Sequence, residues 1–229
     1  MKSVIFLFVF CLSLGQVAFS EEPEYWLIQQ ELIRMGKRDL YEVQKRDFLK
    51  KQADSFKKQK NAFSVLGAED LENPRYVFLM PLQKLDSLGL YPPMAQSEKN
   101  PLLETCLHFK ITSLHELLKK CSLRPSETFK ETHPYYLYIL YDVEPDSEKV
   151  FEEQLAMTVA KQVDPLFSFC TWKALLAGDS PMYLICISFE TKEKMKEWPV
   201  DKFLDKTGVK EVLRGEKSGW MKRSPKLSF

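Results

Sequence analysis

The side chains best suited to metal binding or nucleophilic chemistry are few in this sequence, which has three histidines and five cysteines. Cys106 and His108 lie two positions apart, so on a helix they would point to different sides, whereas ligands that share a helix face are three or four residues apart. His115 lies six residues before Cys121. No two cysteines have the close spacing of a structural zinc site. We therefore predict no metal site.

His133 is the candidate for catalytic proton transfer. Pro134 restricts the residue before it to an extended backbone, which predicts that His133 lies in a loop leading into a strand. A solvated histidine is the ordinary occupant of such a loop, and no family motif surrounds it. Glycine-rich phosphate-binding motifs and the zinc-protease and serine-hydrolase motifs are missing from the sequence.

Two further cysteines are predicted to face each other across a hairpin. If the turn between the apolar runs Leu166 to Leu176 and Met182 to Phe189 centres on Gly178, Cys170 lies opposite Cys186. Alternation then places Phe167, Phe169, Ile185, Ile187 and Phe189 on one face. The other face is smaller and more polar and holds Ser168, Cys170, Trp172, Leu184, Cys186 and Ser188. A disulfide and two free buried cysteines are both compatible with this arrangement, and Cys106 and Cys121 are the other disulfide candidates.

The first twenty residues are typical of a signal peptide. Lys2 precedes the uncharged, largely apolar stretch Val4 to Gly15, which is too short to span a bilayer, and Ala18-Phe19-Ser20 has the small-x-small pattern of a cleavage site. We predict cleavage after Ser20 and export to a periplasm or to the medium; an N-terminal anchor is the alternative. No second apolar run is long enough to span a membrane, so no stable membrane span is expected after cleavage.

The composition is that of a globular protein without a nucleic-acid partner. The 229 residues are 45% hydrophobic and 13% aromatic, enough to form a core. The 33 basic and 32 acidic side chains give a net charge of +1, whereas nucleic-acid binders normally have a clear basic excess.

The chain contains a hidden duplication. Tyr25 and Tyr135, 110 positions apart, open two segments with the same order of elements, and Tyr76 and Tyr183 correspond at a distance of 107. Each segment predicts a strand, a helix, a hairpin and a shorter helix. In the first copy these elements are 25–33, 37–60, 61–68 with 75–82, and 83–88; in the second they are 135–143, 147–163, 166–176 with 182–189, and 191–198. Short closing strands are predicted at 122–125 and 212–215.

Strand, helix, strand, strand, helix, strand is the ferredoxin-like order. Two such repeats can pack their sheets together into a barrel with the helices outside. This layout resembles the dimeric α+β barrel superfamily, which includes antibiotic-monooxygenase-like, NIPSNAP-like and chlorite-dismutase-like proteins. We expect an α+β fold with a signal peptide at 1–20, a first repeat at 21–133 with a helical insertion at 102–120, and a second repeat at 134–229.

The mixed face of the second hairpin is expected to line the space between the two sheets. We predict that this space binds a small apolar or aromatic ligand. Its expected contacts are Ser168, Trp172, Leu184 and Ser188, with Tyr136 and Tyr138 from the opening strand. The resemblance also implies an alternative, an oxygenase or haem-handling enzyme using His133, which is the one case in which haem would be the cofactor. A third alternative is an envelope or secreted interaction protein without a ligand. The sequence leaves the oligomeric state open.

Overall fold

The computed structural model describes residues 23–58, 64–68, 74–82, 85, 101–161, 168–175, 180–199, 203–204, 209, 211–225 and 227–228. The predicted signal peptide lies outside these residues, as does most of the short helix expected at 83–88. Among the helices of the described residues, none combines the length and the apolar character that crossing a membrane requires.

Two successive βαββαβ units account for the described elements. The first contains β1 (Tyr25–Ile33), α1 (Arg38–Lys58), β2 (Ser64–Ala68), β3 (Arg75–Leu82), α2 (Pro101–Cys106) and β4 (Leu107–Leu117). Two short helices follow, η2 (Lys119–Cys121) and α3 (Pro125–Thr128). The second unit contains β5 (Tyr135–Val143), α4 (Glu148–Lys161), β6 (Ser168–Ala174), β7 (Met182–Phe189), α5 (Lys192–Glu197) and β8 (Leu213–Arg223).

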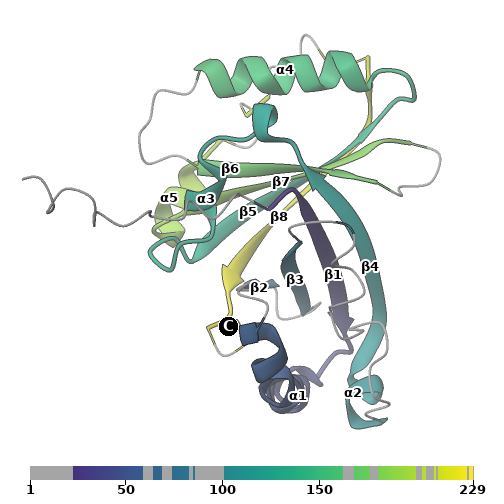
Figure 1. Cartoon of the computed structure of the whole chain (residues 1–229), viewed down its shortest axis with the longest axis vertical. Coiled ribbons are helices and arrows are strands. Elements are labelled where there is room, and N and C mark those ends of the chain that lie inside the picture. Colours follow the sequence, from purple (N-terminus) through teal and green to yellow (C-terminus); the bar gives the residue numbers. More distant parts are fainter. Residues whose placement is uncertain are drawn as a thin grey trace, which may run out of the picture.

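The eight strands close into one barrel in the order β1-β3-β2-β8-β5-β7-β6-β4. Each repeat contributes a four-stranded antiparallel sheet, and the two sheets join where β2 pairs with β8 and where β4 pairs with β6. In Figure 1 the helix α4 lies on the outer side of one sheet and α1 on the outer side of the other. The predicted fold, two ferredoxin-like repeats in a pseudo-dimeric α+β barrel, is therefore observed.

Strand register repeats between the two units. Tyr25 pairs with Leu82 and Tyr135 pairs with Phe189, which keeps the predicted offsets of 110 and 107 residues. The first strand of each unit shifts register at one place, between Leu32 and Ile33 in β1 and between Asp142 and Val143 in β5. A bulge at the equivalent position of each unit shows that the duplication extends to local backbone geometry.

Two sequence predictions were wrong in this part of the chain. The helix expected at 102–120 is only the six-residue α2, and the strand β4 follows it at once. The alternation of Leu107, Phe109 and Ile111 with polar residues is a strand pattern, and pairing with β1 selects it over the helical spacing of the leucines. The closing strand expected at 122–125 is a loop that leads into α3 at Pro125 and has a single bridge from Leu123 to Phe169. The closing strand expected at 212–215 is the start of the longer β8, which begins at Leu213.

Three apolar clusters fill the molecule. One lies between α1 and the first sheet and contains Tyr41, Leu49 and Phe78. A second lies between α4, α5 and the second sheet and contains Phe151, Leu155 and Ile185. The third lies between the two sheets, in the space that the eight strands enclose, which we call the lumen. The predicted alternation of the second hairpin is observed for its described residues, since Phe169 and Ile187 belong to the second cluster and Cys170 and Cys186 to the third; Phe167 lies outside the described residues.

Candidate functional site in the barrel lumen

Four aromatic side chains fill part of the lumen. Trp26 and Trp172 meet edge to face with ring centroids 5.4 Å apart, and Phe129 stacks on Tyr136 at 5.7 Å and on Trp172 at 5.9 Å. Phe129 comes from the segment that follows α3, so the connection between the repeats enters the lumen. This part of the barrel is a packed core and leaves no room for a ligand between these rings.

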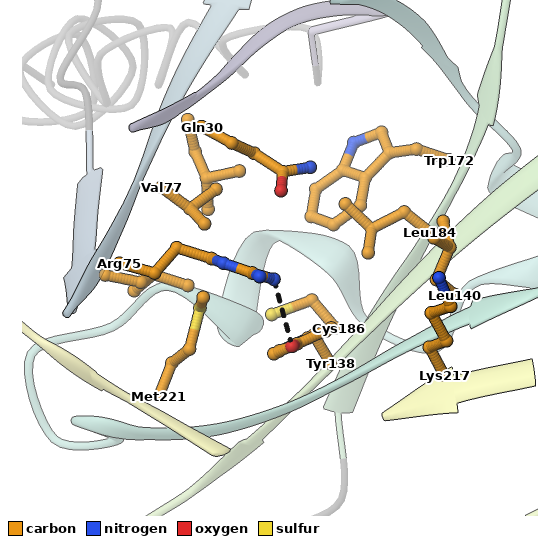
Figure 2. Close-up of a pocket in the computed structure, with 12 residues that line it drawn as sticks. Gln30, Arg75, Val77, Tyr138, Leu140, Trp172, Leu184, Cys186, Lys217 and Met221 are labelled. Carbon is orange, nitrogen blue, oxygen red and sulfur yellow. Dashed lines mark hydrogen bonds between the residues drawn. The ribbon is translucent and has the colours of Figure 1, made fainter. Parts of the chain in front are cut away.

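Beside Trp172 the lumen contains a cavity of about 90 Å³ (Figure 2). Its apolar wall consists of Leu66, Val77, Leu79, Leu140, Leu184 and Met221. Its remaining lining residues can donate hydrogen bonds or carry a thiol, and they are Gln30, Arg75, Tyr138, Trp172, Cys186 and Lys217. Because these residues come from β1, β3, β5, β6, β7 and β8 as well as β2, the cavity exists only when both repeats are folded together.

Arg75 and Tyr138 meet across the cavity. The Arg75 guanidinium donates a hydrogen bond from Nη1 to the Tyr138 hydroxyl at 3.4 Å, as Figure 2 shows. Tyr138 lies opposite Gly219 of β8, and a Cβ at Gly219 would lie 2.6 Å from the tyrosine ring. The bare backbone of Gly219 therefore lets the Tyr138 ring lie against β8. Any other residue at this position would displace the ring and its contact with Arg75.

The structure brings together three of the six predicted ligand contacts. Trp172, Tyr138 and Leu184 line the cavity. Tyr136 is buried in the aromatic part of the lumen, and burial raises the pKa of its hydroxyl. Ser168 and Ser188 are buried and hydrogen bonded to each other at 2.8 Å, away from the cavity lining. Whether any of these residues binds a ligand stays a prediction.

The four described cysteines are free and buried. Cys170 and Cys186 pair across β6 and β7, as the hairpin arithmetic predicted, but no disulfide joins them. Cys106 lies in the cluster beneath α1 and Cys121 in the cluster beneath α4, so these two cannot bond to each other. Burial raises the pKa of Cys121 to about 11 and that of Cys186 well above its usual range, which disfavours their thiolates.

The histidines do not line the cavity. His133 Nδ1 lies 3.0 Å from the Thr132 hydroxyl, and its Nε2 lies 4.0 Å from a Glu190 carboxylate oxygen. His115 is buried in β4 opposite Trp26, and its Nε2 lies 2.8 Å from the Ser113 hydroxyl. Burial lowers the pKa of His115 to about 4, so the ring is neutral at pH 7. His108 is exposed on the same strand.

Sequence reasoning missed most of the cavity wall. Val77 and Leu79 occupy, in the first repeat, the positions of Leu184 and Cys186 in the second, so the alternation argument applied to both repeats would have found them. Lys217 was missed because only the first residues of β8 were assigned to a strand. The same alternation puts Arg75 on the face of Val77 and Leu79, and Gln30 on the face of Trp26 and Ile28, but a polar side chain near a strand end does not by itself indicate a position inside the lumen.

The lining residues do not fit haem. Pockets for drug-sized ligands measure about 300–1,000 Å³, several times the volume of this cavity of about 90 Å³. No histidine lines the cavity, and burial raises the pKa of the lining Cys186 thiol well above its usual range, which disfavours the thiolate that would bind haem iron. A small organic molecule fits this site far better than a large macrocycle does.

Comparisons with known proteins identify the fold of this chain but not its activity. No protein-family model matches the sequence, and no curated protein matches it significantly. Among solved structures, a candidate monooxygenase from Fusobacterium nucleatum subsp. nucleatum is 10% identical to this chain, with a TM-score of 0.60. The aligned region covers 89% of this chain and 93% of the monooxygenase. An anthrone oxidase-like protein is 11% identical with a TM-score of 0.55 and covers 89% of this chain and 92% of its own.

A chlorite dismutase variant from Candidatus Nitrospira defluvii is 10% identical with a TM-score of 0.56, covering 90% of this chain and 93% of its own. The chain therefore has the dimeric α+β barrel fold, with both halves of the barrel supplied by one chain. Unrelated chemistries use the same folds, so at this level of identity the likeness extends to the architecture alone.

Proposed function

We propose that this protein binds a small, mainly apolar or aromatic molecule in the barrel lumen. The observation that carries the proposal is the cavity beside Trp172, which has an apolar wall and a few convergent polar groups. That combination is typical of small-molecule sites. Trp26 and Phe129 pack against the Trp172 ring, so this part of the cavity wall is already ordered and loses little further freedom when a ligand binds.

The cavity volume limits the enclosed part of the ligand to a few carbon atoms. An engineered cavity of about 150 Å³ takes up benzene, so one of about 90 Å³ holds only part of such a molecule. The remainder of the ligand would extend past the exposed side chain of Lys217.

A cavity-filling substitution tests this proposal. We expect 2-phenylethanol or 1-hexanol to shift the indole N–H resonance of Trp172 in a nitrogen-15 correlation spectrum, with assignment by Trp172→Phe. Val77→Phe should abolish the shift, because the added ring occupies the cavity, whereas Val150→Phe on the exposed face of α4 should not. Equal binding by both variants, or no shift with any probe, would contradict the proposal.

An oxygenase or haem-handling enzyme is the second candidate. It is favoured by the structural neighbours described as a candidate monooxygenase and an anthrone oxidase-like protein. His133 does not line the cavity, and the cavity does not fit haem, so a cofactor-free reaction on a bound aromatic substrate is the form of this candidate that the geometry favours. Protein mixed with haem and desalted should show no Soret band that depends on His133; a band lost in His133→Ala would favour the haem enzyme instead.

An interaction protein without a ligand is the third candidate. It has one observation in its favour, the exposed side chains of Phe109 and Ile111, which lie on the same face of β4. The cavity argues for the ligand-binding function over this one, because a scaffold protein has no use for an internal space with donor groups.

We also propose that the protein is exported, on the basis of its first twenty residues. Expression of the full chain in a bacterium with a secretion system should give a product that starts at Glu21, which N-terminal sequencing would establish. A product that keeps residues 1–20 in the membrane fraction would indicate the anchor instead.

A further inference from the structure

The charged groups that line the lumen cavity are both positive. Arg75 and Lys217 carry these charges and present N–H donors, while Gln30 and Tyr138 can both donate and accept hydrogen bonds. Among the described residues that line the cavity, none is acidic. Asp142, two residues beyond Leu140 on β5, is not part of the lining. A ligand that enters this space therefore meets positive charge and hydrogen-bond donors.

These donors are only partly used within the described part of the protein. The single polar contact of Arg75 is the 3.4 Å bond to Tyr138, which leaves most of its five N–H donors available, and Arg75 has no ion pair there. A carboxylate oxygen can therefore accept hydrogen bonds from the remaining guanidinium donors without displacing an ion pair.

The two cations are not required by the fold. Register places Met182 of β7 at the position equivalent to Arg75, and Ile111 of β4 at the position equivalent to Lys217. In the other repeat, the position equivalent to each cation is thus occupied by an apolar residue within the same backbone geometry. Among the described residues, both cations line the cavity, whereas their counterparts in the other repeat do not.

We propose that the ligand of this cavity is an anion, a small carboxylate with an apolar body. Its body lies against Val77, Leu184 and Trp172, and its carboxylate is bound by the Arg75 guanidinium with Lys217 as a second positive charge. Arginine is suited to this because its fork of N–H groups matches the two oxygens of a carboxylate. This inference rests on the proposed ligand-binding function and gives that function a substrate class.

Matched acids and alcohols distinguish the proposed ligand-binding function from the proposal that the ligand is an anion. The purified full-length protein is titrated with phenylacetate and with 2-phenylethanol, and with hexanoate and 1-hexanol, while the Trp172 indole resonance is followed. We expect each acid to bind about tenfold more tightly than its alcohol, which is the usual gain from a charge-assisted hydrogen bond. Binding by neither class would overturn the proposed function itself. Equal binding of acid and alcohol would overturn only the anion assignment.

Substitutions locate the charge. Arg75→Gln should reduce acid binding about tenfold and leave alcohol binding unchanged, because it removes the cation and keeps a donor. Lys217→Gln should act in the same direction with a smaller effect, and its exposed position ensures that the variant folds. Arg214→Gln, an exposed cation on β8 outside the cavity lining, is the matched control and should change neither affinity. An Arg214→Gln effect as large as that of Arg75→Gln would mean that only the overall charge matters, and would overturn the site.

Discussion

The two helix–sheet interfaces of this barrel have the same geometry and opposite chemistry. Beneath α1, Glu31 is 1% exposed and accepts hydrogen bonds from Gln29 and Tyr41, while Lys45, 3% exposed, forms an ion pair with it at 2.6 Å. Lys45 also lies over the Phe78 ring at 4.4 Å. Beneath α4 the equivalent positions are fully buried and hold Ile139, Tyr141, Phe151 and Leu155. One backbone arrangement thus tolerates either a buried ion pair or an apolar core.

The two interfaces also share one polar contact. In each repeat a tyrosine of the third strand donates a hydrogen bond to a glutamate of the long helix, Tyr76 to Glu42 and Tyr183 to Glu152. The accompanying cation comes from the helix in the first repeat, as Arg38, and from β6 in the second, as Lys173. The contact occurs in both repeats although its cation comes from a different element in each, which indicates that the tyrosine–glutamate pair helps to hold the helix on the sheet.

The largest effect is expected from breaking the buried ion pair. Lys45→Met leaves the Glu31 carboxylate buried without its cation, which costs about 3–5 kcal/mol of unfolding free energy. Leu155→Met at the equivalent position of the second repeat is the control and should cost less than about 1.5 kcal/mol. Urea unfolding curves measure both. Equal losses would show that Glu31 and Lys45 are not coupled in the folded protein.

A transplant sharpens the same comparison. The fourfold variant Gln29→Ile, Glu31→Tyr, Tyr41→Phe and Lys45→Leu copies the residues beneath α4 into the first repeat. Replacement of a buried ion pair by packed apolar groups is often neutral or stabilising by about 1–4 kcal/mol. We therefore expect the variant to be at least as stable as the natural protein. A variant less stable than Lys45→Met would mean that the two interfaces differ in shape as well as in charge.

The stability of the first repeat is expected to depend on pH through His115. The equivalent residue of the second repeat is Met221, which does not titrate. The His115 pKa falls from about 6.5 in the unfolded chain to about 4 in the folded one because the ring is buried. The unfolded state therefore binds a proton that the folded state does not, and about 3 kcal/mol of stability, present above pH 6.5, is lost as the pH falls to about 4. His115→Met should remove this part of the slope. Parallel pH profiles for both proteins would contradict the assignment.

The shared tyrosine–glutamate contact predicts equal, modest losses. Tyr76→Phe and Tyr183→Phe each remove one hydrogen bond to a carboxylate, at a cost of about 1–2 kcal/mol. A double-mutant cycle with Glu42→Gln or Glu152→Gln isolates each contact. A loss confined to one repeat would show that the contact matters in only one of the two interfaces.

The smallest effect concerns the cysteines. Because all four described cysteines are free and buried, a reducing agent should leave the melting temperature unchanged. In a protein that starts at Glu21, and so lacks Cys11, a thiol reagent such as Ellman's should react slowly with the folded chain, since the pKa of Cys186 is raised by burial, and should find all four thiols after unfolding. Two missing thiols would reveal a disulfide, and Cys170 with Cys186 are the pair that the strand register allows.

The order of elements could be determined from the sequence because each signal is local. Aromatic and aliphatic runs, helical spacing and turn residues predicted the strands, the long helices and the second hairpin with its register from Cys170 to Cys186. The offset between Tyr25 and Tyr135 then revealed the duplication. The prediction failed at β4, where leucines at helical spacing overlap an alternating strand pattern, and pairing with β1 decides between the two.

The composition of the cavity lining depends on how the barrel closes. Which strand faces join across the seams between β2 and β8 and between β4 and β6 depends on contacts between residues far apart in the chain. That closure turns Arg75 and Lys217 toward the same space as Trp172 and fills the rest of the lumen with Phe129. A one-dimensional pattern specifies which side of a strand is apolar, but the size of a cavity and the charges that meet in it follow only from the packing of the two sheets against each other.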